Sequence, residues 1–298
     1  MFALPVEISE KLQNKAASLR DDYQKLSENY RERKGEQLSL SQAFAYAVGR
    51  LPATCSVINF VLSKFLLKYE NFSSILDVGA GCGALPIVLE DSNIHYEAIE
   101  KSREMIQVFQ HLLGENFSIH RNDFLNFATE SKYEAVFASY SVNEFSDKES
   151  ALRKMFELSS RYIFIIEPGM PIGYKNILLA KNIAQDFGAH SILPCASEKC
   201  TLQDGDWCHF SVRVHRAKNH MLIKNGNLPF EDEKFCFAIF SKNENDISNN
   251  NTIVKRPIKR SGHMIFDVCT SNGVCRKTVP NRKLKEKFDW GDELVIEE

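Results

Sequence analysis

The stretch Ile75-Leu76-Asp77-Val78-Gly79-Ala80-Gly81-Cys82-Gly83 decides the fold of this 298-residue chain. Its apolar first half is typical of a buried strand, which ends at an acidic residue and a glycine-rich turn. The segment Ala84 to Leu89 that follows can begin a helix. Glycines in such a turn let backbone amides approach a ligand where a Cβ atom would collide. The pattern therefore predicts a strand, a ligand-binding loop and a helix in succession.

Short apolar runs separated by amphipathic segments continue beyond this stretch. We expect further strands at His95 to Ile99, Ala135 to Ser139 and Tyr162 to Ile166. Strands that alternate with helices are typical of a parallel sheet. The sequence therefore predicts an α/β fold with a Rossmann-like core over residues 71–190.

Residues 1–70 form a different region, for which helical spacing predicts a helical lead-in. Its apolar stretches Phe44 to Leu51 and Val57 to Leu67 are separated by Pro52. Residues 191–298 are expected to form a β-rich, cysteine-bearing extension. Its strands are expected at Phe210 to Val214, Phe235 to Phe240 and Met264 to Val268.

The charge of the chain is balanced overall but not locally. The 37 Lys and Arg residues against 39 Asp and Glu residues give a net charge of -2, which argues against coating the whole surface with nucleic acid. Between Ile253 and Lys287, however, ten basic residues face two acidic ones. This stretch can hold phosphates or be a solvated lysine-rich face.

No run approaches the roughly 18 apolar residues of a membrane span, and residues Met1 to Glu10 lack the pattern of a secretory signal. We therefore expect a cytoplasmic protein without a membrane partner. Nothing indicates a coiled coil or an obligate dimer, so we expect a monomer. In a reducing compartment the eight cysteines are expected in the core or as metal ligands rather than in disulfides.

Two acidic residues further along the chain support a ligand-binding role for the glycine loop. Glu100 ends the next strand, where a carboxylate can accept hydrogen bonds from ribose hydroxyls. Asp123 falls where a third strand would end and can face an adenine amino group. Taken singly, such carboxylates are more often surface groups or helix caps. In series with a GxGxG loop they resemble the motifs of class I methyltransferases more than a GxGxxG dehydrogenase. The predicted S-adenosylmethionine site consists of Asp77, Gly79, Gly81, Gly83, Glu100 and Asp123.

The residues that would catalyse methyl transfer are not identified by the sequence. The segment Ser139 to Glu144, at the end of the fourth strand, has no amine-methylating tetrad such as Asn-Pro-Pro-Tyr. Methyl transfer needs chiefly alignment of the two reactants, with a base where the acceptor is protonated. Asn143, Glu144 and Glu167 are candidates, with helix caps and polar loop groups as the alternative interpretation.

Three cysteines, Cys195, Cys200 and Cys208, lie within fourteen residues of a loop-like segment. Cys269 or Cys275 can supply a fourth thiolate from a distant strand. Four thiolates suit tetrahedral zinc or a four-iron cluster, although the spacing differs from the CxxC pairs of zinc ribbons.

Other interpretations of the cysteines and histidines stay open. A buried cysteine often acts as a small apolar residue, which is our interpretation of Cys55 and Cys236, while Cys82 fills the glycine turn. Histidines could replace a thiolate ligand, although a lone histidine is more often a hydrogen-bonding residue. The candidates are His190, His209, His215, His220 and His263.

The chain resembles a family of methyltransferase-like proteins associated with the mitochondrial small ribosomal subunit, together with their bacterial relatives. The similarity runs over most of the length. It is carried by Gly49 to Thr54, Asp77 to Gly83, Glu167-Pro168-Gly169, Asp206 to Ser211, Glu231 to Phe235, Arg256-Pro257, Gly262-His263, Asp267-Val268-Cys269 and Trp290-Gly291-Asp292.

The resemblance implies a factor that contacts ribosomal RNA of the small ribosomal subunit and binds S-adenosylmethionine. It also implies a 4Fe-4S cluster held by Cys195, Cys200, Cys208 and Cys269, with zinc as the alternative metal. Two functions follow from it: an rRNA methyltransferase or a non-catalytic ribosome assembly factor. Without the resemblance, the residues favour a small-molecule methyltransferase with a structural zinc site. A fold does not by itself decide among them.

Overall fold

The structure is a computed structural model that describes residues 2–13, 18–32, 38–89, 93–195, 200, 202, 205–246, 251–284 and 287–294. The chain forms two compact units. The first unit comprises Met1–Glu130, Phe137–Ser139 and Val212–Glu233, and the second comprises Ser131–Val136, Tyr140–Ser211 and Lys234–Glu298.

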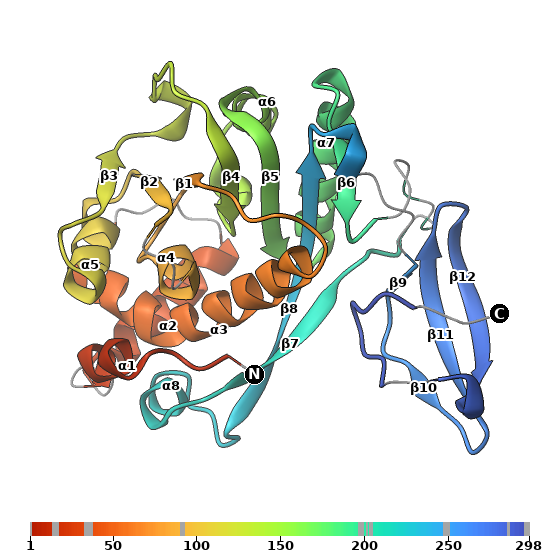
Figure 1. The fold of residues 1–298 in the computed structure, drawn as a ribbon. Helices are drawn as coiled ribbons and strands as arrows, with labels where there is room; N and C mark the ends of the chain where they lie inside the picture. Colours follow the sequence, from red (N-terminus) through yellow and green to blue (C-terminus); the bar gives the residue numbers. More distant parts are fainter. Residues whose placement is uncertain are drawn as a thin grey trace. The chain divides into compact units, whose positions relative to one another are not determined.

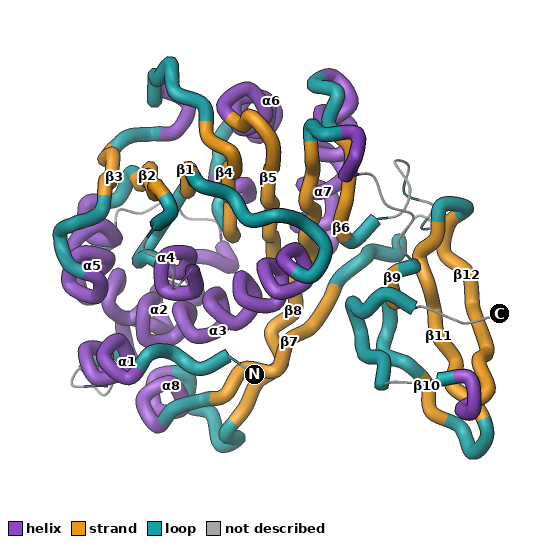
Figure 2. The backbone as a smooth tube through the Cα atoms, viewed as in Figure 1, coloured by secondary structure: helices purple, strands orange, loops and turns teal. Residues whose placement is uncertain are grey.

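Helices and strands alternate along most of the chain (Figures 1 and 2). The α-helices are α1 (Val6–Gln13), α2 (Arg20–Glu32), α3 (Leu40–Leu66), α4 (Ala84–Leu89), α5 (Arg103–Leu113), α6 (Lys148–Leu158), α7 (Pro171–Asp186) and α8 (Lys218–Ile223). The strands of the larger sheet are β1 (Ser74–Val78), β2 (His95–Glu100), β3 (Ser118–Arg121), β4 (Tyr133–Ser139), β5 (Ser159–Pro168), β6 (His190–Leu193), β7 (Phe210–His215) and β8 (Phe230–Ser241). Short 3₁₀ turns are η1 (Phe124–Asn126), η2 (Val142–Glu144), η3 (Glu244–Asp246) and η4 (Asn281–Lys283).

The larger sheet has the strand order β3-β2-β1-β4-β5-β8-β6, with β7 paired to β8. Strands β1, β2 and β3 pair in parallel. Strand β8 is antiparallel to β5 and to β6, between which it lies. A mixed sheet with one antiparallel strand inserted next to the edge strand, as β8 is between β5 and β6, is the Rossmann-like α/β arrangement of class I methyltransferases. The predicted fold class of the core is therefore confirmed.

The strands and the helix predicted around the glycine loop lie where the sequence placed them, and α4 spans Ala84–Leu89. Two strands differ in their setting. We assigned Phe210 to Val214 and Phe235 to Phe240 to a C-terminal extension, but they belong to β7 and β8 of the larger sheet. The reason is clearest for β8. The physical reason is burial: the segment from Phe235 to Ser241 is buried throughout because strands flank it on both sides.

Helix α3 contains both apolar stretches that flank Pro52 and is continuous over 27 residues. Ser39 and Gln42 form a capping box at its start, with hydrogen bonds of 3.2 and 2.9 Å. Residues on both sides of Pro52 are buried, and α3 packs against α2, α4 and α5, its neighbours in Figure 1. This packing outweighs the cost of about 3 kcal/mol of an interior proline.

Among the described residues, α3 is also the one helix long and apolar enough to cross a membrane by length and composition. In its most apolar window, however, 72% is buried inside the protein. Its apolar composition is thus accounted for by its place in the core.

A smaller sheet lies in the second unit and consists of β9 (Thr252–Ile253), β10 (Ile258–Lys259), β11 (His263–Thr270) and β12 (Gly273–Pro280). Its strands have the order β10-β11-β12, with β9 paired to β11. It has a small apolar core of its own: Ile253, Phe266, Val268, Val279 and Leu294. Most of its basic side chains are exposed; two charged residues of the basic stretch, Lys285 and Glu286, lie outside the described residues.

Candidate functional site

The glycine loop leaves β1 with three residues in the left-handed region. Gly79, Gly81 and Gly83 have φ values of 75°, 56° and 89°, a region that side chains other than glycine rarely adopt. A Cβ atom on Gly83 would come within 2.6 Å of Leu113 Cδ1. The amides of Gly79 and Ala80 donate to the carbonyl of Ile99 on β2, at 2.8 and 3.1 Å. The loop is thereby held against the end of the neighbouring strand.

Glu100 fixes the tip of this loop. Its Oε2 accepts a hydrogen bond from the Gly81 amide at 2.9 Å, and its Oε1 accepts one from the Ser102 amide at 2.8 Å. The residue is only 9% exposed. Because a carboxylate has about four acceptor positions, the same oxygens can also accept from ligand hydroxyls. The structure thus joins the predicted carboxylate to the glycine loop, while their binding of a cofactor stays a prediction.

Asp77 is a buried acid at the start of the loop. Tyr96 donates its hydroxyl proton to Asp77 Oδ2 at 2.7 Å. Burial raises the pKa of Asp77 to about 7, although the hydrogen bond from Tyr96 acts in the opposite direction. A cationic ligand nearby would favour the charged carboxylate.

A pocket of about 370 Å³, open to solvent, lies beside the loop. We call it the glycine-loop pocket; it is lined by Tyr46, Leu51, Thr54, Ile58, Asp77, Gly79, Ala80, Gly81, Cys82, Ala84, Leu85 and Ser139. One wall comes from α3, which the acidic and glycine motifs of the sequence do not indicate. The only signal for it was the segment from Gly49 to Thr54, part of the family resemblance.

Of the six predicted cofactor residues, Gly83, Glu100 and Asp123 are not among those that line this pocket; Glu100 is joined to it through the Gly81 amide. Asp123 is exposed and caps η1, where its Oδ1 accepts a hydrogen bond from the Leu125 amide at 2.9 Å. This is the helix-cap role that the sequence left open as an alternative. A contact between Asp123 and an adenine ring stays a prediction.

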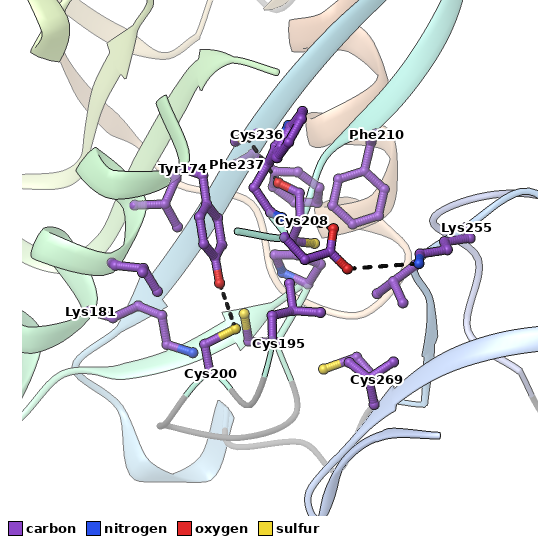
Figure 3. Close-up of a pocket in the computed structure, with 18 residues that line it drawn as sticks. Tyr174, Lys181, Cys195, Cys200, Cys208, Phe210, Cys236, Phe237, Lys255 and Cys269 are labelled. Atoms are coloured by element: carbon purple, nitrogen blue, oxygen red, sulfur yellow. Dashed lines mark hydrogen bonds and ion pairs between the residues drawn. The ribbon is translucent and has the colours of Figure 1, made fainter. Parts of the chain in front are cut away.

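The four predicted cysteine ligands, Cys195, Cys200, Cys208 and Cys269, line one pocket of the second unit (Figure 3). We call it the thiol pocket; it encloses about 630 Å³ including space open to solvent. Of the two candidates for the fourth thiol, Cys269 lines the pocket, whereas Cys275 is exposed elsewhere on β12.

A fifth cysteine, Cys236 on β8, also lines the thiol pocket, although we expected it only to pack in the core. Its Sγ donates to the Cys208 carbonyl at 3.0 Å. Burial raises the pKa of the Cys208 thiol well above its usual value, and the neighbouring thiols, Cys195 first, act in the same direction. Without a cation, the neutral form of the Cys208 thiol is therefore favoured.

The thiols face one pocket without forming a closed metal centre. Within the part of the chain that the structure describes, no group of three or more His, Cys, Asp or Glu side chains is close enough to hold a metal ion. Of the histidines considered as substitute ligands, His209 precedes β7 and stacks on Trp207, with ring centroids 5.8 Å apart. None of the five considered histidines lines the pocket.

The candidate catalytic residues are held by local contacts in the second unit. Glu167 is fully buried, and Asn176 Nδ2 donates to its Oε2 at 2.6 Å. Burial raises the pKa of Glu167 to about 7. Asn143 Oδ1 accepts from Lys148 Nζ at 3.2 Å, and Glu144 ends η2. These positions assign no catalytic residue.

Comparison with known proteins places the chain in a family. The model of the mitochondrial small ribosomal subunit Rsm22 family matches residues 40–294, which is most of the chain. The chain belongs to the Rsm22 family. The resemblance stated from the sequence is thereby confirmed.

Individual relatives of this Rsm22-family chain are more distant. A protein of Bacillus cereus described as an uncharacterized methyltransferase is 26% identical over 117 residues, which cover 39% of this chain and 53% of that protein. A protein of Bacillus anthracis matches with the same values. The chain thus spans about half the length of the curated relatives it matches.

Solved structures similar to the Rsm22-family chain include two methyltransferases. The plantazolicin methyltransferase BpumL, in complex with SAH, has a TM-score of 0.45 at 15% identity, covering 80% of this chain and 98% of that one. Magnesium protoporphyrin IX methyltransferase from Synechocystis PCC 6803, with bound SAH, has a TM-score of 0.42 at 13% identity, covering 77% and 100%. Because both scores are low, the fold assignment rests on the strand order.

Segments that carry the Rsm22 resemblance meet one another in space. In the first unit, Arg50 makes a two-pronged ion pair with Glu233, at 3.1 and 2.8 Å. In the second unit, Trp207 Nε1 donates to the Gly169 carbonyl at 3.2 Å, and the His209 ring meets Trp290 edge-on at 5.2 Å. The family motifs are therefore in part structural, because they join distant parts of the chain.

Proposed function

We propose that this Rsm22-family protein binds S-adenosylmethionine and methylates RNA of the small ribosomal subunit, as a cytoplasmic monomer. The observation that carries the proposal is the glycine loop, whose Gly81 amide is tied to the Glu100 carboxylate beside an open pocket. The glycines let a ligand approach the loop backbone where side chains would collide, and the Glu100 carboxylate has further acceptor positions for ribose hydroxyls.

The charge of the cofactor suits the acid at the start of the loop. S-adenosylmethionine carries an ammonium and a sulfonium group, both cationic. Asp77 lines the glycine-loop pocket, and burial alone leaves its carboxylate poorly stabilised. A bound cation would compensate that cost, whereas a neutral or anionic nucleotide would not.

The ribosomal partner is supported by the family and by local charge. The family description refers to the mitochondrial small ribosomal subunit. Exposed basic residues gather on and beside the smaller sheet: Lys255, Arg256, Lys259, Arg260, Arg276, Arg282, Lys283 and Lys287. Positive groups bind phosphates of any RNA sequence, and such binding weakens steeply with salt.

The proposal includes a 4Fe-4S cluster held by Cys195, Cys200, Cys208 and Cys269. The fit rests on the donor set, because four thiols face one pocket whose other walls include apolar side chains such as Phe237. The thiols still have to move together on binding, since they do not form a ready metal centre. Zinc is the alternative for the same donors.

A second function, a non-catalytic assembly factor, is favoured by one observation. The candidate catalytic residues Asn143 and Glu167 are engaged by Lys148 and Asn176, and no amine-methylating tetrad stands near them. In this case the cofactor would stabilise the fold or act as a sensor.

One experiment separates these functions. The full chain, purified without oxygen, is mixed with labelled S-adenosylmethionine and small-subunit particles, and label is measured on protein-bound cofactor and on RNA. Label on RNA supports the methyltransferase. Tight cofactor binding and salt-sensitive co-sedimentation without labelled RNA support the assembly factor. Cofactor binding without any co-sedimentation rejects the ribosomal partner and leaves the small-molecule methyltransferase.

A further inference from the structure

Helix α7 presents one face to the thiol pocket. Tyr174, Ile177, Leu178 and Lys181 all line it, at the i, i+3, i+4 and i+7 spacing of a single helical face. Ile177 and Leu178 form an apolar part of the pocket wall. The other two bring a hydroxyl and an ammonium group to a pocket of thiols.

Tyr174 contacts a predicted ligand directly. Its hydroxyl lies 2.9 Å from Cys200 Sγ, and Figure 3 draws this hydrogen bond. In the free thiol either atom can donate. Once Cys200 is a thiolate bound to iron it has no proton, so the phenol must be the donor. The hydrogen bond then stabilises negative charge on the sulfur.

Lys181 adds a buried cation to the same pocket. It is only 5% exposed, and charges interact more strongly away from bulk water. A four-iron cluster with four thiolate ligands carries net negative charge, which increases further when the cluster is reduced.

We propose that Tyr174 and Lys181 are positioning residues that stabilise the thiolate ligands and raise the reduction potential of the cluster. The inference rests on the proposed cluster site. Hydrogen bonds to the sulfurs and local charge are known determinants of cluster potential. Because both groups favour the more negative, reduced state, removing either one lowers the potential.

The test uses the full-length chain purified anaerobically, in three single variants. Tyr174→Phe removes only the hydroxyl, and Lys181→Met removes only the charge. Lys175→Met is the matched control, since Lys175 lies on the same helix but is exposed and does not line the pocket. Iron per chain and thermal unfolding are measured first, and the midpoint potential is then obtained by redox titration followed by electron paramagnetic resonance.

We expect a more negative potential in Tyr174→Phe and Lys181→Met, no shift in Lys175→Met, and recovery in Lys181→Arg. Lower iron content in a well-folded Tyr174→Phe protein would also support the inference. Wild-type potentials in both variants would overturn the inference while leaving the cluster intact. A wild-type protein that holds no iron would instead reject the proposed cluster, and the inference with it.

Discussion

The glycine-loop pocket and the thiol pocket differ in how complete they are before a ligand arrives. In the first, the loop backbone is already held by hydrogen bonds: the Gly81 amide donates to Glu100, and the Gly79 amide donates to the Ile99 carbonyl. In the second, four thiols share a pocket but do not form a metal centre among the described residues. The loop of the first pocket is held by contacts between segments close together in the chain, whereas the thiols of the second come from Cys195 to Cys269.

This difference has an energetic consequence. A preformed site costs little free energy to organise, so a single substitution there should lower ligand affinity only partly. A site completed by its ligand couples binding to ordering of the chain, so loss of one ligand can abolish it. The predictions below test this contrast, in decreasing order of expected effect.

The largest effect is expected from Cys200→Ser, which should reduce iron per chain to near zero, because a cluster site without one of its thiolates is not completed. Cys275→Ser is the matched control: both cysteines are exposed, so neither change disturbs the core. Iron and sulfide analysis with visible absorbance measures the result. Equal iron in both variants would exclude Cys200 as a ligand.

A smaller, graded effect is expected from Glu100→Gln, which keeps the size of the side chain but removes its charge. Hydrogen bonds to charged groups contribute about 1.5–3 kcal/mol, so S-adenosylmethionine affinity should fall about 10- to 100-fold. The control is Glu97→Gln on the same strand; that carboxylate contacts His95 and His120 instead of the loop. Calorimetry gives both affinities. A larger loss in Glu97→Gln would contradict the assigned role of Glu100.

The two pockets also differ in how much of them the sequence could predict. The strand ending in Asp77, the glycines and Glu100 lie close together in the chain, so local patterns located them and the fold around them. The α3 wall of the pocket was missed, because its contact with the loop is formed only by tertiary packing. Packing also explains why Pro52 did not end the helix.

The thiol pocket shows the limit of local patterns more clearly. Spacing identified the Cys195 to Cys208 group but could not choose between Cys269 and Cys275, which are six residues apart on a hairpin. Only the pairing of β11 and β12 distinguishes them. Likewise, Cys236 lines the pocket because β8 joins the main sheet, which its apolar sequence did not reveal.

An effect of about tenfold is expected from pH, through Asp77. Its pKa of about 7 means that the free protein binds a proton there as pH falls below 7, whereas a cationic cofactor favours the carboxylate. Cofactor affinity should therefore fall about tenfold between pH 8 and pH 6, and Asp77→Asn should remove this dependence.

Stability follows the opposite sign, because the ordinary pKa of 3.8 is lower than the folded value. The folded state binds the extra proton between these values, so stability decreases as pH rises from about 4 to about 7. Glu167, also with a pKa of about 7, contributes a similar slope. Affinity is therefore the decisive readout, and a flat affinity profile in the wild type would exclude a charged Asp77 beside the ligand.

The smallest effect separates backbone strain from ligand contact. Gly81 and Gly188 have nearly equal φ values of 56° and 61°, and a Cβ atom at either position would meet nothing within 4 Å. Changing either one to alanine should therefore cost about 1 kcal/mol of unfolding free energy through strain alone. Chemical denaturation measures this cost. Because only Gly81 lines the glycine-loop pocket, only Gly81→Ala should also weaken cofactor binding. Equal binding by the two variants would mean that the loop tolerates displacement at Gly81, and that the first pocket is less preformed than its hydrogen bonds indicate.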